Sequence, residues 1–133
     1  TVQLEDVKSY KKAWKDAGHE GEPTTVVRIP TLLADTKEEA ERLSDELMVL
    51  ARRYFNGRIG IGSTDAGSAS PDTTEEVNLF GTAEDVVEKI EVLREQYGTD
   101  EIMFEVNWTS SVPRDVVTNS VRILSDKVIP KFK

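Results

Sequence analysis

The seventeen residues from Thr24 to Ala40, TTVVRIPTLLADTKEEA, decide the fold class. The first part, Thr24–Ala34, is short, rich in β-branched residues and apolar on both faces, which is typical of a parallel strand covered on both sides. Thr36 follows, with Glu39 three positions later, and this spacing predicts a capping box at the start of a long helix. A strand that continues directly into a helix indicates a parallel βαβ unit.

The rest of the chain repeats this alternation. We expect helices at about 4–17, 36–54, 82–97 and 113–129, and a second strand, EIMFEV, at 101–106. Two parallel strands do not form an independently stable sheet. The sequence therefore predicts an α/β fold with about two parallel strands and four helices that form part of a larger sheet.

Three local expectations can be tested in a structure. Pro30 has no N–H to donate, so we expect a bulge or irregularity in its strand. Residues 56–78, rich in glycine and serine, predict a long flexible insertion. In the last helix, the spacing predicts an inward face made of Val117, Val121, Leu124 and Val128.

Length and composition exclude several classes of protein. The chain has 133 residues, enough for one domain, whereas a complete (β/α)₈ barrel needs roughly 250. With 17 basic and 25 acidic residues the net charge is −8, which argues against nucleic-acid binding. No cysteine is present, which excludes disulfides and thiolate catalysis and fits a reducing compartment. We find no signal peptide and no stretch of apolar residues long enough to cross a membrane, so we expect a cytoplasmic protein that binds neither nucleic acid nor membrane.

Most motif-like features have an ordinary structural explanation. The glycines of Gly57–Gly62 follow a helix and lack phosphate-loop spacing, so a flexible loop is favoured over a nucleotide site. His19, the single histidine, lies just past a predicted helix end, which favours an exposed turn residue over a catalytic one. Asn107-Trp108-Thr109 matches the glycosylation triplet, but this short pattern is common by chance.

Arg28 and Trp108 each allow two interpretations. Arg28 lies inside an apolar strand, where a buried guanidinium needs a partner. That partner is either a carboxylate such as Glu105 on the other strand, which we favour, or an anion or flavin facing a barrel interior. Trp108, just past a strand end, either packs under a helix or forms an aromatic wall at the mouth of a barrel.

Three segments, in order, resemble the luciferase-like flavin-dependent monooxygenases. They are 27–40, with its strand ending in Ala-Asp-Thr-Lys-Glu-Glu-Ala; 80–86, Phe-Gly-Thr-Ala-Glu-Asp-Val; and 121–130, ending in Val-Ile-Pro. The second segment has Ala83 where the family usually has proline. The resemblance covers nearly the whole chain and concerns the C-terminal part of that family.

The resemblance implies a fold, a chemistry and site residues. The chain is similar to the C-terminal segment, residues 1–133, of a (β/α)₈ TIM barrel, with its two strands as the seventh and eighth. It implies reduced FMN or a deazaflavin, used with O₂ to oxidise a small organic substrate. Arg28 resembles an arginine that some members direct toward the flavin, and Asn107 and Trp108 would then line the barrel mouth. Most phosphate contacts and catalytic groups of the family come from earlier strands, so we expect this chain to be inactive alone.

Two kinds of partner follow from these expectations. A partial barrel leaves strand edges unpaired, so we expect a homo-oligomer or association with the remainder of the barrel. The alternative function is a non-catalytic, dimerising α/β module that binds no cofactor.

Overall fold

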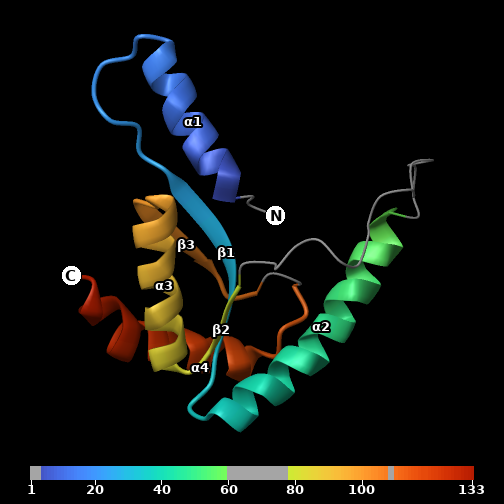
Figure 1. Ribbon diagram of the computed structural model, residues 1–133. Helices are drawn as coiled ribbons and strands as arrows, with labels where there is room; N and C mark the ends of the chain where they lie inside the picture. Colours follow the sequence, from blue (N-terminus) through green and yellow to red (C-terminus); the bar gives the residue numbers. More distant parts are fainter. Residues whose placement is uncertain (1–3, 60–77, 108–109) are drawn as a thin grey trace.

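The computed structural model describes residues 4–59, 78–107 and 110–133. The elements, in chain order, are α1 (Leu4–Asp16), β1 (Val26–Leu33), α2 (Lys37–Ile59), β2 (Leu79–Gly81), α3 (Ala83–Tyr97), β3 (Glu101–Glu105) and α4 (Arg114–Ile123), followed by a π turn (Leu124–Val128) and a 3₁₀ turn (Ile129–Lys131). Figure 1 shows α3 and α4 beside the strands, α2 extending to one side and α1 standing at the opposite end.

The strands form one open, parallel sheet in the order β2-β1-β3. The predicted α/β class with parallel strands and four helices is confirmed, and β2 is an additional third strand. Three residues are too few to give a strand pattern in the sequence. Tertiary contacts hold β2 in place: Leu79 is fully buried, and the ammonium of Lys89 on α3 donates a 2.9 Å hydrogen bond to the carbonyl of Phe80.

The irregularity expected at Pro30 is not present, because β1 runs without a break from Val26 to Leu33. Pro30 is the last residue of β1 that pairs with β3, opposite Glu105, and Thr31 is the first that pairs with β2, opposite Leu79. The missing N–H therefore lies where one ladder ends and the other begins, and the strand tolerates it there.

Two apolar clusters pack on the two faces of β1. On the first face, Val27, Ile29 and Leu33 contact α3 and the π turn. On the second face, Leu32 packs with α2 and the start of α4 in a cluster completed by Ala34, Ala40, Leu43, Leu47, Val112 and Val116. Only the carboxyl-terminal half of β1 is thus covered on both faces, and in its amino-terminal half exposed and buried side chains alternate.

The inward face predicted for the last helix is wrong at Val121, which is 48% exposed, and only partly right at Val117, which is partly buried. The buried residues of α4 are Val116, Ser120 and Ile123, while Leu124 and Val128 are buried in the π turn as expected. A buried serine broke the apolar periodicity on which the prediction depended. It is buried because its hydroxyl bonds to the backbone of Leu33 at 3.0 and 3.2 Å.

The predicted helix ends are largely confirmed. Thr82 and Asp85 form a reciprocal capping box at the start of α3, and Gly98 ends that helix at φ 63°. α2 is longer than expected and continues to Ile59, so residues 56–59 are helical rather than part of the insertion. The rest of the predicted flexible segment, residues 60–77, lies outside the described residues.

Candidate functional site

The three sequence motifs meet at the carboxyl-terminal edge of the sheet. Asp35, the first residue after β1 and Ala34, accepts hydrogen bonds from Arg122 at 2.9 and 3.0 Å and from Asn119 at 3.1 Å, both on α4. The hydrogen bonds of Arg122, and then that of Asn119, hold the pKa of Asp35 below its ordinary value of 3.8. The Asp of the Ala-Asp-Thr segment therefore fastens the end of β1 to α4.

The second motif is joined to the first in the same way. Lys37, at the start of α2, lies 3.6 Å from the carboxylate of Asp85 in α3. Asp85 also occupies the space next to Gly81, where an added Cβ would come within 2.7 Å of the Asp85 Cβ. Gly81 has φ +150°, so both its backbone conformation and this close approach require glycine. These contacts explain the motifs as joints between elements.

Arg28 forms an ion pair with Glu105, as the favoured interpretation of the sequence predicted. The Arg28 Nε and the Glu105 Oε2 are 3.4 Å apart, and the pair joins β1 to β3. The expectation that the guanidinium is buried is wrong, because the Arg28 side chain is 68% exposed. The strand is apolar on the other face there, whereas the face that carries Arg28 is exposed at Val26 and Arg28 and becomes covered by α2 and the start of α4 only at Leu32.

We call this exposed surface the open face and define it by Val26 and Arg28 on β1 and Glu101, Met103 and Glu105 on β3. The register places Val26 opposite Glu101 and Arg28 opposite Met103, so the five side chains share one side of the sheet. Val26 is 54% exposed and Met103 is 55% exposed. Parallel sheets are normally covered on both faces, so the exposed apolar residues of the open face depart from the usual packing.

Of the two residues predicted at the barrel mouth, the structure describes Asn107 but not Trp108. Asn107 is exposed at the end of β3, where its Oδ1 accepts a 3.2 Å hydrogen bond from the N–H of Val112 and its carbonyl accepts one from Ser110. Its side chain thus holds the loop that leads to α4. Trp108 lies outside the described residues. That Arg28, Asn107 and Trp108 contact a cofactor remains a prediction.

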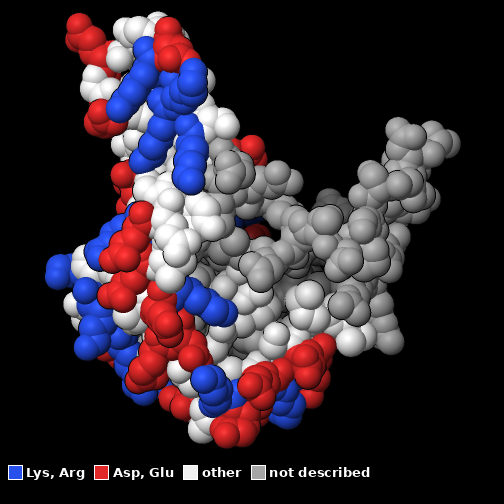
Figure 2. Space-filling view, viewed as in Figure 1, with Lys and Arg blue, Asp and Glu red and all other residues white. Residues whose placement is uncertain are grey.

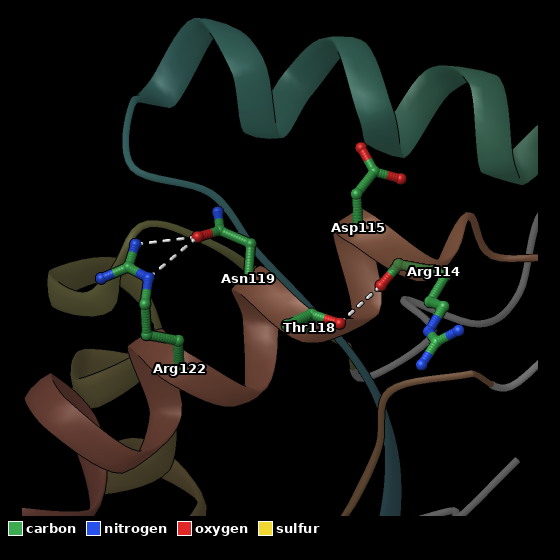
Figure 3. A pocket seen from close by; sticks show the side chains of 5 residues that line it. All are labelled: Arg114, Asp115, Thr118, Asn119 and Arg122. Atoms are coloured by element: carbon green, nitrogen blue, oxygen red, sulfur yellow. Dashed lines mark hydrogen bonds between the residues drawn. The ribbon is translucent and has the colours of Figure 1, made fainter.

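A surface cavity of about 630 Å³ lies along α4, and the described residues that line it all belong to this helix. Figure 3 shows Arg114, Asp115, Thr118, Asn119 and Arg122 around it. Arg122 is held by Asp35 and Asn119, and the Thr118 hydroxyl donates to the carbonyl of Arg114. Three of the five lining side chains, Thr118, Asn119 and Arg122, are therefore engaged within the helix or with Asp35.

The opposite, amino-terminal edge of the sheet carries contacts that the sequence pattern did not indicate. The Asp100 carboxylate accepts hydrogen bonds from the backbone N–H and the hydroxyl of Thr25 at 2.9 and 2.8 Å, and Lys11 of α1 lies 3.5 Å from it. The backbone hydrogen bond of Thr25, with that of its side chain, holds the pKa of Asp100 below 3.8. No periodicity signals such a contact, because its partners are far apart in the chain.

The described part of the chain contains neither a metal-binding group of side chains nor a helix that could span a membrane. Within 4–59, 78–107 and 110–133, no group of three or more histidine, aspartate and glutamate side chains could hold a metal ion. None of the helices described there has the length and apolar character needed to cross a bilayer. His19 is exposed, as predicted, and stacks on Trp14 with their ring centroids 4.5 Å apart.

The charges are distributed unevenly over the surface. In the view of Figure 2, basic side chains gather over α1, while acidic side chains gather over α3 and the first turns of α2. The basic residues of α1 are Lys8, Lys11, Lys12 and Lys15. Three of these lysines already face carboxylates, Lys11 at Asp100, Lys12 at Asp16 and Lys15 at Glu22, so this patch is partly neutralised.

Comparisons with known proteins give a fold but no sequence family. No family model matches the chain, and no curated protein matches it significantly. The monooxygenase RslO1 from Streptomyces bottropensis matches with a TM-score of 0.72 and 17% identity, over 98% of this chain and 38% of that one. The oxygenating constituent of 3,6-diketocamphane monooxygenase from Pseudomonas putida, a type II Baeyer–Villiger monooxygenase solved in complex with FMN, matches with a TM-score of 0.61 and 24% identity.

The second match covers 98% of this chain and 41% of that protein, so the chain spans about two fifths of the length of both structures. The predicted likeness in fold to monooxygenases is therefore confirmed over nearly the whole chain. The sheet is open and corresponds to part of a TIM barrel.

Proposed function

We propose that this chain is the C-terminal segment of the (β/α)₈ barrel of a luciferase-like flavin-dependent monooxygenase, which oxidises a small organic substrate with reduced flavin and O₂. The observation that carries the proposal is the likeness in fold to two monooxygenases over 98% of the chain. The same chain carries the three family-like motifs in order, and they contact one another at the edge of the sheet.

The open face fits one side of a flavin. Arg28 supplies an exposed cation, and Val26 and Met103 supply exposed apolar surface beside it. A planar aromatic ring that carries negative charge matches this combination, and either FMN or a deazaflavin satisfies it. When bound, the flavin supplies the oxygen chemistry, and the protein supplies binding, orientation and electrostatics.

Each proposed site residue has a limited role. Arg28 would place positive charge beside the flavin or an anionic substrate, and Asn107 and Trp108 would line the mouth of the barrel. The described residues offer one wall of such a site, and we assign no catalytic group among them. We therefore propose that the chain is inactive without the remainder of the barrel.

A second function is supported by the exposed edges of the sheet. Among the residues that the structure describes, β2 and β3 each pair on one side only, and the open face exposes Val26 and Met103. A non-catalytic module that dimerises through these surfaces and binds no cofactor would bury them equally well.

Two measurements decide between these functions. The first is the intact mass of the natural polypeptide, which we expect near 40 kDa because a complete barrel needs roughly 250 residues plus insertions. The second is a titration of that polypeptide with FMN under reducing conditions, which should show saturable binding. A natural polypeptide of 14.9 kDa that forms a dimer and binds no FMN would overturn the proposal in favour of the module.

A further inference from the structure

We propose that the open face binds aromatic anions at Arg28, and that Glu105 sets the affinity by competing for the same guanidinium. This deepens the proposed function, because a reduced flavin is one such anion. The evidence consists of the geometry of the ion pair, the unequal exposure of its partners, and the apolar residues beside it.

The ion pair leaves Arg28 able to take a second partner. The contact joins Nε of Arg28 to one oxygen of Glu105 at 3.4 Å, a longer and less directed contact than a two-point arginine–carboxylate pair. A guanidinium has five N–H donors in a planar fork, and this side chain is 68% exposed. Donors therefore remain for an anion that arrives from solvent.

Arg28 and Glu105 differ in solvent exposure, and therefore in how much each charge relies on the other for stabilisation. Glu105 is 30% exposed, whereas Arg28 is 68% exposed. Removal of the Glu105 charge leaves a well-hydrated arginine, whereas removal of Arg28 leaves a half-buried carboxylate without its cation. A change at Glu105 is therefore the milder perturbation, and it isolates the effect of competition on binding.

The apolar surface next to the ion pair indicates which kind of group the ligand carries besides its anion. Met103 lies opposite Arg28 and is 55% exposed, and Val26 lies two residues before Arg28 on the same face and is 54% exposed. A ligand with an aromatic plane and one anionic group would cover Met103 and Val26 and place its charge at Arg28. A neutral ring would gain only the apolar contacts.

Glu101 provides a matched control within the same face. Glu101 and Glu105 each lie two positions from Met103 along β3, so both are diagonal neighbours of Arg28 across the strand pair. Of these two carboxylates, the structure records an ion pair with Arg28 for Glu105. Glu101→Gln removes the same charge from the same face without removing that partner.

The experiment titrates the full chain with 8-anilinonaphthalene-1-sulfonate, an aromatic anion that fluoresces when bound, and with N-phenyl-1-naphthylamine, its neutral analogue. We expect Glu105→Gln to tighten sulfonate binding about two- to fivefold, the range that corresponds to an exposed ion pair, and to leave the neutral probe unchanged. Glu101→Gln should have a clearly smaller effect. In the Arg28→Met background, Glu105→Gln should no longer tighten sulfonate binding.

The proposal is overturned if both glutamate variants act alike, if the gain persists without Arg28, or if the neutral probe gains as much as the sulfonate. Glu105→Asp, which keeps the charge but shortens the side chain by one methylene, should give an intermediate gain, and it replaces Glu105→Gln if that variant does not fold. Because neither probe is a flavin, tighter sulfonate binding together with no FMN binding would contradict the proposed function and leave this inference standing.

Discussion

Ser120 is the buried polar group that joins α4 to the end of β1. Its hydroxyl accepts a 3.0 Å hydrogen bond from the N–H of Leu33 and donates one of 3.2 Å to the carbonyl of the same residue. The side chain is 1% exposed, so water cannot replace these bonds.

Ser120→Ala should therefore lower the free energy of unfolding by about 1–3 kcal/mol, because it leaves buried backbone groups without a partner. Urea denaturation followed by circular dichroism measures this change. Ser125→Ala, at an exposed serine of the π turn, is the control and should change little. Equal effects of the two substitutions would show that the contact with Leu33 contributes nothing to stability.

Arg28→Met tests the proposed site residue in the complete enzyme. We expect turnover to fall on the order of 10²-fold, the usual cost of one well-placed electrostatic contact. The melting temperature should change little, because the side chain is 68% exposed and exposed ion pairs contribute little to stability. A large fall in melting temperature, with the specific activity of the folded enzyme unchanged, would mean that Arg28 is structural.

At the scale of elements, α3 and α2 differ in how completely their amino-terminal ends are capped. Thr82 and Asp85 cap α3 reciprocally, with the Asp85 carboxylate accepting a 3.0 Å hydrogen bond from the N–H of Thr82. At the start of α2, Thr36 accepts a 3.3 Å bond from the N–H of Glu39, but the Glu39 carboxylate accepts from Arg42 at 2.7 and 2.9 Å. The predicted capping box of α2 is therefore only half formed.

Thr82→Ala should lower the free energy of unfolding by about 1 kcal/mol, and Thr36→Ala should lower it by clearly less. The physical reason is that Thr82→Ala removes two hydrogen bonds of the hydroxyl, the 3.4 Å bond that it accepts from the N–H of Asp85 and the 2.9 Å bond that it donates to the Asp85 carboxylate. Thr36→Ala removes one, the 3.3 Å bond from the N–H of Glu39. Thermal denaturation of both variants side by side shows which substitution destabilises the protein more. The reverse order would contradict this account of the two caps.

At the scale of the whole molecule, carboxylates fasten both edges of the sheet. Hydrogen bonds hold the pKa of Asp35, Asp85 and Asp100 below the ordinary value of 3.8. In that range the unfolded chain binds more protons than the folded chain, so stability rises with pH. This contribution is fully present above about pH 3.8 and is lost as the pH falls through the lower pKa values of the folded state.

We therefore expect Asp100→Asn to destabilise the protein at neutral pH and to flatten the loss of stability below about pH 4. Urea denaturation at a series of pH values measures both effects. Asp126→Asn, at an exposed residue of the π turn, is the control. An Asp100 variant with the same dependence on pH as the unsubstituted chain would contradict the assigned role.

The exposed strand edges and the open face also bear on assembly. We expect the chain at micromolar concentration to pair with itself or with the remainder of the barrel, because isolated parallel strands with an uncovered face are poorly stable alone. Light scattering checks this expectation. A well-folded monomer of 14.9 kDa would contradict it.

Features that depend on neighbouring residues could be predicted from the sequence alone. The alternation of helices and strands, the capping box of Thr82 and the stop at Gly98 were predictable because their interactions span only a few positions. The likeness in fold to monooxygenases was predictable for a related reason, since each of the three segments that carry it is a short run of consecutive residues.

Contacts between residues distant in the chain depend on how the elements pack, and the sequence pattern did not predict those of β2 and Ser120. β2 exists because β1 and α3 hold three residues in place, and Ser120 faces inward because Leu33 offers backbone partners 87 positions away. Arg28 was expected to be buried because its strand looked apolar on both faces. The sheet instead leaves that face open around Arg28, because burial depends on which elements lie above a strand, and periodicity along the strand carries no information about them.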